Sequence, residues 1–370
     1  MKLICDREKF SSAFQLAAGV APTRSPKPIL ENVKLEIEGE MGTLMATDLE
    51  VGLRIEMPGL EVKSPGTVVL PIKRVGSILR ESPDEKLHLE SDGTKLRIYG
   101  QRSEFQLPVQ NPDEFPAVSG FEEESYHQLP ARALREVFRR TVFATDTESS
   151  RYALGGVLLE LVAERIIGVG TDGRRLARQE GPAESIAGHQ TTDNTVVPTR
   201  AVQLIERALG DSDEEVRLAA RENDLLLRSG RTTISTRLVE GRYPRWRDVF
   251  PDYGQMTKIE MSVGPFYSAV RQAAIVTSEE RRGVDFVFGE GKLLLTGHGA
   301  EMGESRVEMP IAYDGPAIAV KLDPRFVAEF LRVLELEQTF TLHLRDAQSA
   351  VVGTTDDGYG YVIMPLAQDK

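Results

Sequence analysis

The sequence predicts an α+β protein built from three repeated domains, each with two helices packed on antiparallel sheets. Segments such as "KLRIYG" (95–100) and "FTLHLR" (340–345) alternate apolar and polar residues, which is typical of antiparallel strands with one buried face. Turn signals such as "SDGTK" (91–95) separate these segments. The stretch "RIEMP" (54–58) returns as "RVEMP" (306–310), which indicates an internal repeat.

The repeat extends well beyond this short match. The corresponding segments are "ENVKLEIEGEMGTLMATDLE" (31–50), "GGVLLELVAERIIGVGTDGR" (155–174) and "GVDFVFGEGKLLLTGHGAEM" (283–302). Val33 and Thr47 of the first fall on Val157 and Thr171 of the second. A unit of about 120 residues can bury its own core, so each copy is expected to be a domain. We place the domains at 1–118, 119–252 and 253–370.

Each copy reads as a strand, a helix, further strands, a second helix and a last group of strands. The predicted helices lie at 6–19, 71–81, 130–141, 198–210, 264–276 and 323–335. In the third of these, Leu134, Val137 and Phe138 recur at the spacing of one helix face. Arg135 and Arg139 fall on the opposite face. This helix is therefore expected to bury its apolar side and expose arginines.

The charge distribution favours a polyanionic partner in spite of the overall acidity. The net charge is −12, which by itself argues against a basic nucleic-acid-binding surface. The predicted helices, however, together carry a net positive charge, so the rest of the chain is more acidic still. Similar domains that contact one another head to tail can close into a ring. With the helices inward, such a ring holds a polyanion through phosphate contacts that read no base sequence.

The composition is that of an ordinary globular protein, with 41% apolar and 28% charged residues. No apolar run is long enough to span a membrane and the N-terminus has no signal pattern, so we expect a cytoplasmic protein. The one cysteine, Cys5, lies in an alternating segment and is expected to be a buried small hydrophobe. The five histidines are scattered, so neither a metal site nor a cofactor is predicted.

The best candidate for a nucleotide-binding motif fails on its context. "GVGTDG" (168–173) fits the pattern G-x-G-x-x-G, which binds dinucleotides where a strand precedes it and a helix follows. The residues that follow, "RRLARQEGP", alternate and are too few for a crossover helix. No catalytic residues are predicted. An enzyme whose site forms at a domain junction, for instance around Asp172 and Arg175, remains as an alternative.

Several motifs in fixed order carry a family resemblance over essentially the whole chain. They are "PILENV" (28–33), "TDLE" (47–50), "TDGRRLA" (171–177), "VEGRYPRW" (239–246), "RGV" (282–284) and "YVIMPL" (361–366). With them the sequence resembles the bacterial DNA polymerase III β subunit family, the β sliding clamps. The resemblance implies a head-to-tail homodimer whose ring encircles duplex DNA. It also implies a clamp loader that opens the ring, tethering of the replicative polymerase α subunit and of other proteins with clamp-binding motifs, and no catalysis.

The resemblance implies a cleft for partner peptides, with Arg174 and Arg175 at its rim. Its residues are Leu154, Thr171, Gly173, Arg174, Arg175, Leu176, Pro244, Val249, Val362, Met364, Pro365 and Leu366. Leucine, valine, methionine and proline side chains form an adaptable groove for apolar anchors. The sequence departs from the family at Arg174, where histidine is common, and at Ala367, where a basic residue is common. Peptide preference is therefore expected to differ.

The resemblance and the helix faces predict two further sets of residues, one facing DNA and one at a dimer seam. Arg24, Lys73 and Tyr152 match family positions that face DNA, and the exposed helix faces add Arg80, Arg135, Arg139, Arg200 and Arg207. Ala153 stands where the family sometimes has an aromatic residue, which weakens the expectation of stacking there. The implied dimer seam places Ile275 and Val276 against Phe105 and Leu107 of the second copy, and Arg74 against Glu301 and Glu304.

A second function class stays open beside the clamp. A scaffold of tandem domains that binds only proteins would use the same apolar groove and leave its basic helices without a partner.

Overall fold

The computed structural model describes residues 1–146, 148, 153–191, 194–210, 214–278, 282–299 and 302–367. Internal contacts divide the chain into two compact units. Unit 1 comprises Met1–Arg132, Leu161–Glu164 and Ala183–Leu238, and unit 2 comprises Ala133–Glu160, Arg165–Pro182 and Val239–Lys370. The second repeat is thus shared between the units. The boundaries at residues 118 and 252 stay predictions.

Unit 1 contains the first repeat and half of the second. Its helices are α1 (Arg7–Ala18), α2 (Ile72–Glu81) and α4 (Thr199–Leu209), with short η1 (Pro28–Glu31) and η2 (Pro112–Glu114). Its strands are β1 (Lys2–Asp6), β2 (Asn32–Glu38), β3 (Met41–Thr47), β4 (Val51–Met57), β5 (Glu61–Ser64), β6 (Gly66–Pro71), β7 (Lys86–Ser91), β8 (Lys95–Tyr99), β9 (Glu104–Pro108), β10 (Tyr126–Pro130), β14 (Glu184–Ile186), β15 (Val196–Pro198), β16 (Glu215–Ala220), β17 (Asp224–Ser229) and β18 (Thr232–Arg237). All of them except β15 form sheets of order β5-β1-β7-β8-β9 and β14-β10-β16-β17-β18-β4-β3-β2-β6.

Unit 2 contains the third repeat and the other half of the second. Its helices are α3 (Ala131–Arg139), α5 (Trp246–Val249), α6 (Val263–Ala273) and α7 (Pro324–Arg332), with short η3 (Val142–Ala144) and η4 (Ala274–Val276). Its strands are β11 (Gly156–Val162), β12 (Arg165–Thr171), β13 (Arg175–Pro182), β19 (Thr257–Ser262), β20 (Val284–Gly289), β21 (Lys292–Gly299), β22 (Gly303–Pro310), β23 (Ile318–Leu322), β24 (Thr339–Leu344), β25 (Val351–Thr354) and β26 (Gly360–Ile363). They form strand orders β11-β12-β13-β26-β25-β24-β19 and β22-β21-β20-β23.

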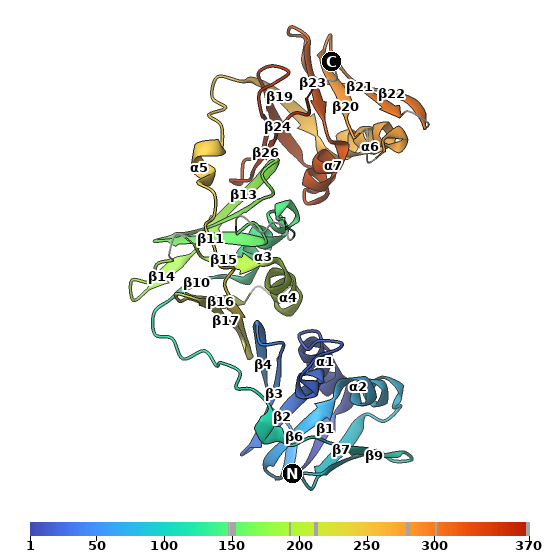
Figure 1. The fold of residues 1–370 in the computed structure, drawn as a ribbon, viewed down its shortest axis with the longest axis vertical. Coiled ribbons are helices and arrows are strands. Elements are labelled where there is room, and N and C mark those ends of the chain that lie inside the picture. The colour runs from blue at the N-terminus through green and yellow to red at the C-terminus, as the bar shows by residue number, and fades with distance from the viewer. Residues whose placement is uncertain are drawn as a thin grey trace. The chain divides into compact units, whose positions relative to one another are not determined.

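The six predicted long helices are confirmed as α1, α2, α3, α4, α6 and α7, each within a few residues of the expected ends. Asp6 and Asp323 cap two of them, because their carboxylates accept from the backbone N–H of Lys9 (2.9 Å) and Arg325 (3.0 Å). α3 starts one residue later than predicted, since Pro130 still belongs to β10. Within the first repeat α1 packs beside α2, and within the third α6 packs beside α7 (Figure 1).

The same pair of strand meanders occurs in every repeat. The first meander is β2-β3-β4, β11-β12-β13 and β20-β21-β22, and the second is β7-β8-β9, β16-β17-β18 and β24-β25-β26. "RIEMP" lies at the end of β4 and "RVEMP" at the end of β22, so the repeated letters mark equivalent strands. The last strand of a first meander pairs with the last strand of the following repeat's second meander, as β4 with β18 and β13 with β26.

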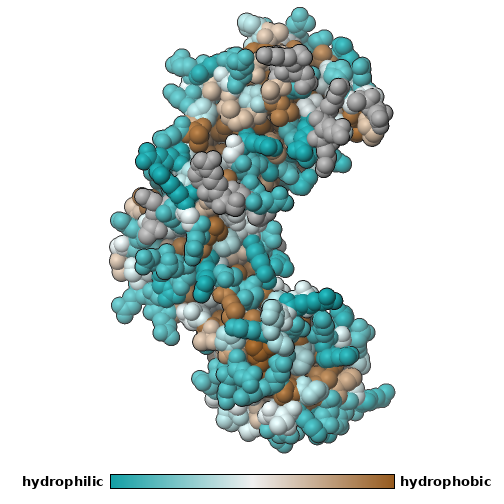
Figure 2. Space-filling view, viewed as in Figure 1, coloured by the Kyte–Doolittle hydropathy of each residue, from teal (hydrophilic) through white to brown (hydrophobic). Residues whose placement is uncertain are grey.

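The apolar helix faces are buried as the periodicity predicts. Leu134, Val137 and Phe138 of α3 are fully buried, as are Phe10 and Phe14 of α1. On the visible surface, hydrophilic side chains predominate and hydrophobic ones lie in small patches (Figure 2). Among the residues described, no helix is both long and apolar enough to cross a membrane.

The first two glycines of "GVGTDG", Gly168 and Gly170, serve packing and not phosphate binding. β13 and not a helix follows β12, so the rejection of a dinucleotide motif is confirmed. A Cβ on Gly168 would lie 2.4 Å from Val137 Cγ1, and a Cβ on Gly170 would lie 2.1 Å from the Thr141 carbonyl oxygen. These glycines let the end of α3 approach the strand closely.

A buried histidine pair lies in the part of the second repeat that belongs to unit 1. The Nδ1 atoms of His127 and His189 are 2.7 Å apart, and both rings are buried. His189 Nε2 lies within hydrogen-bond distance of both the N–H (3.0 Å) and the carbonyl oxygen (3.2 Å) of Ala220, and one of the two facing Nδ1 atoms donates to the other. Burial lowers the pKa of His127 to about 4 and also lowers the pKa of His189. The pair is therefore neutral at neutral pH.

Candidate partner-binding cleft, DNA-facing residues and edge strands

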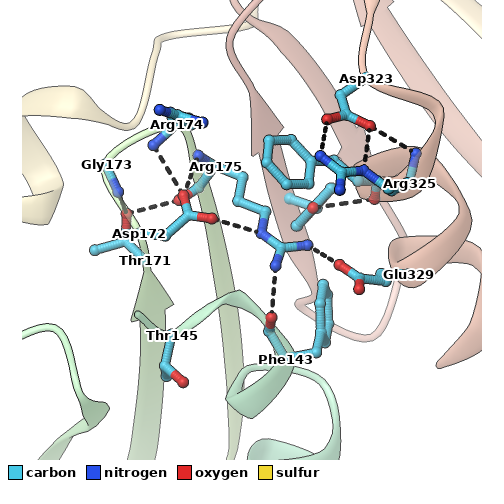
Figure 3. A network of polar contacts seen from close by, with 12 residues as sticks. Phe143, Thr145, Thr171, Asp172, Gly173, Arg174, Arg175, Asp323, Arg325 and Glu329 are labelled. Carbon is cyan, nitrogen blue, oxygen red and sulfur yellow. Dashed lines mark hydrogen bonds and ion pairs between the residues drawn. The ribbon is translucent and has the colours of Figure 1, made fainter. Parts of the chain in front are cut away.

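The turn between β12 and β13 is fixed by its own side chains. Thr171 Oγ1 donates to the Arg175 carbonyl (2.6 Å) and accepts from Gly173 N–H (3.1 Å). Asp172 Oδ1 accepts from the N–H groups of Arg174 (2.9 Å) and Arg175 (3.0 Å). Gly173 takes a φ of +84°, a conformation that glycine adopts at low cost. "TDGRR" thus encodes a rigid turn (Figure 3).

Strand pairing attaches the C-terminal segment to this turn. Leu176 of β13 lies opposite Val362 of β26, and Met364 N–H donates to the Arg174 carbonyl (2.9 Å). The Val362 side chain is buried while Met364 is 49% exposed. The chain then continues through Pro365 to Leu366, whose N–H donates to the Lys321 carbonyl (2.8 Å). The structure therefore brings together two segments of the predicted cleft, residues 171–176 and 362–366, that lie far apart in the sequence.

The remaining cleft residues come from two further segments. Ala153 N–H donates to the Arg242 carbonyl (3.3 Å), which places the segment before Leu154 beside the segment before Pro244. Leu154 is buried and Pro244 half-buried. Val249 lies at the end of the short helix α5, which the sequence analysis did not predict. Val249 is 61% exposed, and like Met364 it is a large apolar residue exposed to solvent.

The structure corrects the interpretation of Arg175 as a rim anchor. Only 8% of its side chain is exposed. Its guanidinium donates to Asp172 Oδ2 (3.0 Å), to the Phe143 carbonyl (2.7 Å) and to Glu329 (Figure 3). It also lies 4.3 Å from the ring centroid of Phe326. Every nitrogen already has a partner, so Arg175 joins the second repeat to the third and is not free for a peptide.

Electrostatics support this structural role. Burial alone would lower the pKa of Arg175, but Tyr361 and Glu329 outweigh it and raise the pKa. Arg174, by contrast, is exposed and its side chain points away from Arg175 (Figure 3). The sequence reasoning missed Glu329 and Phe143, which are distant in the chain and carry no local signal.

The residues expected to face DNA differ in their exposure to solvent and in the contacts that their side chains make within the chain. Arg24 and Lys73, expected from the family resemblance, and Arg80, Arg139 and Arg207, expected from the helix faces, are all exposed. Arg135 is only half-buried, with Nη1 shielded from solvent. Arg200 forms an ion pair with Asp48 (2.8 Å) and donates to the Val20 carbonyl (3.0 Å), so its first role is structural. Tyr152 lies outside the described residues.

The residues expected at a dimer seam lie on two strand edges and beside them. Phe105 and Leu107 are on β9, and Phe105 is 39% exposed. Ile275 on η4 is 72% exposed and Val276 half-buried. Glu304 is exposed on β22 and contacts His298 (3.4 Å). Arg74 is exposed on α2, and Glu301 lies outside the described residues.

The sequence reasoning missed one apolar residue beside this seam. Met302 is 63% exposed and directly precedes β22. Met302 corresponds to Glu50 when "RVEMP" is aligned with "RIEMP". An apolar residue at a turn position that is polar in the first repeat was therefore the sequence signal that could have identified Met302.

A reactive cysteine and a metal site both find little support in the structure. Burial raises the pKa of the Cys5 thiol to about 12, so the prediction of a buried, inert cysteine is confirmed. In the part of the chain that the structure describes, no three His, Cys, Asp or Glu side chains gather to hold a metal ion.

Repeated two-helix domains joined through strand edges define the class of DNA clamps. The family models for the N-terminal, central and C-terminal domains of the DNA polymerase III beta subunit match residues 1–119, 128–245 and 247–367 in turn. The chain belongs to the DNA polymerase III beta subunit family, the sliding clamps. This confirms the predicted family and the fold of three clamp domains.

Named relatives match along the whole chain. The beta sliding clamp of Pseudomonas putida is 29% identical over 99% of this chain and 100% of its own. The beta sliding clamp of Escherichia coli is 26% identical over 99% of this chain and 100% of its own. The crystal structure of the DNA polymerase III subunit beta from Pseudomonas aeruginosa superposes with a TM-score of 0.91 at 27% identity, covering 100% of both chains.

Proposed function

We propose that this protein is a DNA sliding clamp, a head-to-tail homodimer that encircles duplex DNA and tethers the replicative polymerase. The single observation that carries the assembly is the repeated strand pairing. β4 pairs with β18 and β13 with β26, and each pair joins one repeat to the next. The equivalent strands left over are β22 of the third repeat and β9 of the first. The family is that of a processivity factor and not of an enzyme.

The leftover edges differ from the paired ones in exposure. β4 and β13 each begin with three buried residues and contain further buried ones, whereas β22 and β9 consist only of exposed and half-buried residues. Over the described residues, each has one strand neighbour. An open edge with free N–H and C=O groups is a template for pairing with another chain. Pairing of β22 with β9 of a second copy continues the rule used inside the chain.

Apolar side chains beside these edges supply most of the seam energy. Ile275 and Met302 flank β22, and Phe105 projects from β9. Burying each such side chain contributes about 1.5–3 kcal/mol. Arg74 against Glu304 of the second copy adds at most about 1 kcal/mol, because exposed ion pairs are screened.

DNA is held by charge and topology and not by sequence. The exposed basic side chains of Lys73, Arg80, Arg139 and Arg207 lie on helices and that of Arg24 on the loop after α1, in a chain of net charge −12. Phosphate contacts by lysine and arginine are sequence-independent and salt-sensitive. We expect the acidic remainder to repel DNA from any other surface.

Partner proteins dock by short peptides on the cleft. Met364 and Val249 offer exposed apolar contacts, and Arg174 offers a charged rim in place of the buried Arg175. Polymerase α subunit, clamp loader and other proteins with clamp-binding motifs are the expected partners in the cytoplasm. Arg174 favours peptides with an acidic group at that position.

The test is retention on circular DNA. Protein loaded by its cognate loader and ATP should stay on a nicked circle through gel filtration and leave when the circle is cut. Ile275→Asp with Val276→Asp should give monomers in sedimentation and abolish retention, because the new charges cannot be buried. Leu336→Asp is the matched control, since Leu336 is 55% exposed in the same repeat away from the seam. Partner binding without retention on the circle would favour the scaffold instead.

A further inference from the structure

The junction between the first and second repeats contains a pocket that corresponds to the partner cleft of the other junction. The turn between β3 and β4 repeats the "TDGRR" hydrogen bonds. Thr47 Oγ1 donates to the Val51 carbonyl (2.8 Å) and accepts from Leu49 N–H (2.9 Å). Asp48 Oδ1 accepts from the N–H groups of Glu50 (3.0 Å) and Val51 (2.7 Å). Each bond has its counterpart in the turn from Thr171 to Arg175.

The next strand continues the correspondence. Arg237 N–H donates to the Glu50 carbonyl (2.9 Å), as Met364 N–H donates to the Arg174 carbonyl (2.9 Å). Val51 lies opposite Thr236 as Arg175 lies opposite Ile363. Glu50 therefore occupies the place of Arg174, and Arg237 occupies the place of Met364.

A cavity of about 170 Å³ opens at this junction. Leu49, Glu50, Val118 and Arg237 contribute to its lining. It lies wholly within unit 1. Within the described residues the side chains of Glu50 and Arg237 take part in no hydrogen bond or ion pair, whereas Asp224 on the same wall is paired with Arg221 (2.6 Å). The pocket thus presents one free carboxylate and one free guanidinium.

Leu49 is the unusual feature of this wall. Its φ is +80°, in the left-handed region, where a bulky residue is strained. The corresponding residue in the partner cleft is Gly173, with a φ of +84°. The Leu49 side chain is nevertheless 43% exposed at the pocket. Residues with a strained backbone conformation concentrate at functional sites, ligand-binding sites among them.

We propose that this pocket is a second peptide-docking site, with charge preference opposite to that of the partner cleft. Its occupant is an extended protein segment with a basic side chain beside an apolar one. The basic group pairs with Glu50, and the apolar group covers Leu49 and Val118. A carboxylate further along the segment pairs with Arg237. The partner cleft, with Arg174 in place of Glu50, selects an acidic neighbour instead.

Fluorescence anisotropy with two labelled peptides tests the proposal. One probe is fluorescein-Gly-Lys-Leu-Leu-Asp-Gly-amide, whose aspartate supplies the carboxylate for Arg237, and the other carries Asp in place of Lys. Glu50→Arg should weaken the lysine peptide about tenfold and leave the aspartate peptide unchanged, since close charge pairs dominate such contacts. Arg174→Glu should do the reverse. The two residues are matched controls for each other, because both lie at the same position of the same turn.

A third variant separates binding from folding. Leu49→Gly relieves the strained φ, so its thermal midpoint should not fall while affinity for the lysine peptide drops. The proposal is overturned if wild type does not bind the lysine peptide, if Glu50→Arg leaves that binding intact, or if Arg174→Glu removes it. Glu50→Arg should keep full retention on circular DNA, so failure of this pocket and failure of the clamp are distinguishable.

Discussion

The two junctions inside the chain share one backbone design and differ in the side chains that hold it. β4 pairs with β18 in unit 1, and β13 pairs with β26 in unit 2. In unit 2 two buried arginines, Arg140 and Arg175, reach Asp357 and Glu329 of the third repeat. In unit 1 the ion pairs between repeats use Arg200 with Asp48 and Arg228 with Glu56, and the two arginine side chains are 60% and 33% exposed. Strand pairing is therefore common to both junctions, and buried arginines are an addition at one of them.

This difference has a functional side. Buried ion pairs give specific geometry more readily than net stability. The junction with buried arginines is the one that carries the proposed partner cleft. We infer that Arg140 and Arg175 hold the Thr171–Arg175 turn and the C-terminal segment in one arrangement for peptide binding.

The largest expected effect comes from removing Arg175. Arg175→Met should cost about 3 kcal/mol of unfolding free energy, because Asp172 and Glu329 lose their shared cation. Arg175→Lys should recover part of this, since it keeps the charge and loses the fork geometry. Trp246, the one tryptophan, lies in unit 2 and reports urea unfolding by fluorescence. A loss below about 1 kcal/mol for Arg175→Met would make the strand pairing sufficient at both junctions.

Acid should weaken unit 1 more than unit 2. His127 has a pKa near 4 in the folded state, below the ordinary histidine value, so the unfolded chain takes up its proton first. The stabilisation is complete above about pH 6.5 and is lost as pH falls toward 4, by about 3 kcal/mol. Circular dichroism should then show unfolding before Trp246 fluorescence does.

A non-titrating variant isolates this effect. His127→Gln should flatten the dependence between pH 6.5 and 4, whatever its stability at pH 7. In unit 2 burial and Lys258 also lower the pKa of His343. We expect this histidine to give unit 2 a smaller acid sensitivity, against which the acid sensitivity of unit 1 is compared. Equal acid sensitivity in both units would contradict the prediction.

Transplanting Leu49 into the other junction measures its strain. Gly173→Leu places a bulky residue at a φ of +84° where an added Cβ meets nothing within 4 Å, so the cost is backbone strain alone. We expect about 1 kcal/mol in urea unfolding. Gly173→Asn should cost less, because asparagine tolerates left-handed backbone. Equal costs for the two variants would show that Leu49 stores no particular strain.

The smallest effect is expected at Arg200. Arg200→Ala should cost less than about 1 kcal/mol, since the guanidinium is largely in solvent and Asp48 keeps its two backbone donors. Unfolding followed by circular dichroism measures it. A loss as large as that of Arg175→Met would remove the distinction between the junctions.

The sequence alone determined the repeated architecture of this protein. Apolar periodicity defined the long helices, and "RIEMP" with "RVEMP" identified equivalent strands, because local pattern and chain-order repetition are written in adjacent residues. The short helix α5 and the tight packing of Gly168 and Gly170 carried no comparable signal.

Tertiary structure alone decided what individual arginines do. Arg174 and Arg175 are neighbours of one type, yet one is exposed and the other is buried between Phe143, Phe326 and Glu329. Those partners lie far away in the chain, and alternation on a strand fixes opposite faces without saying which face meets another repeat. Tertiary structure also decides that the outer edges of β9 and β22 are open. Whether a strand edge is open depends on where the fold places the other strands, which the sequence of the strand itself does not show.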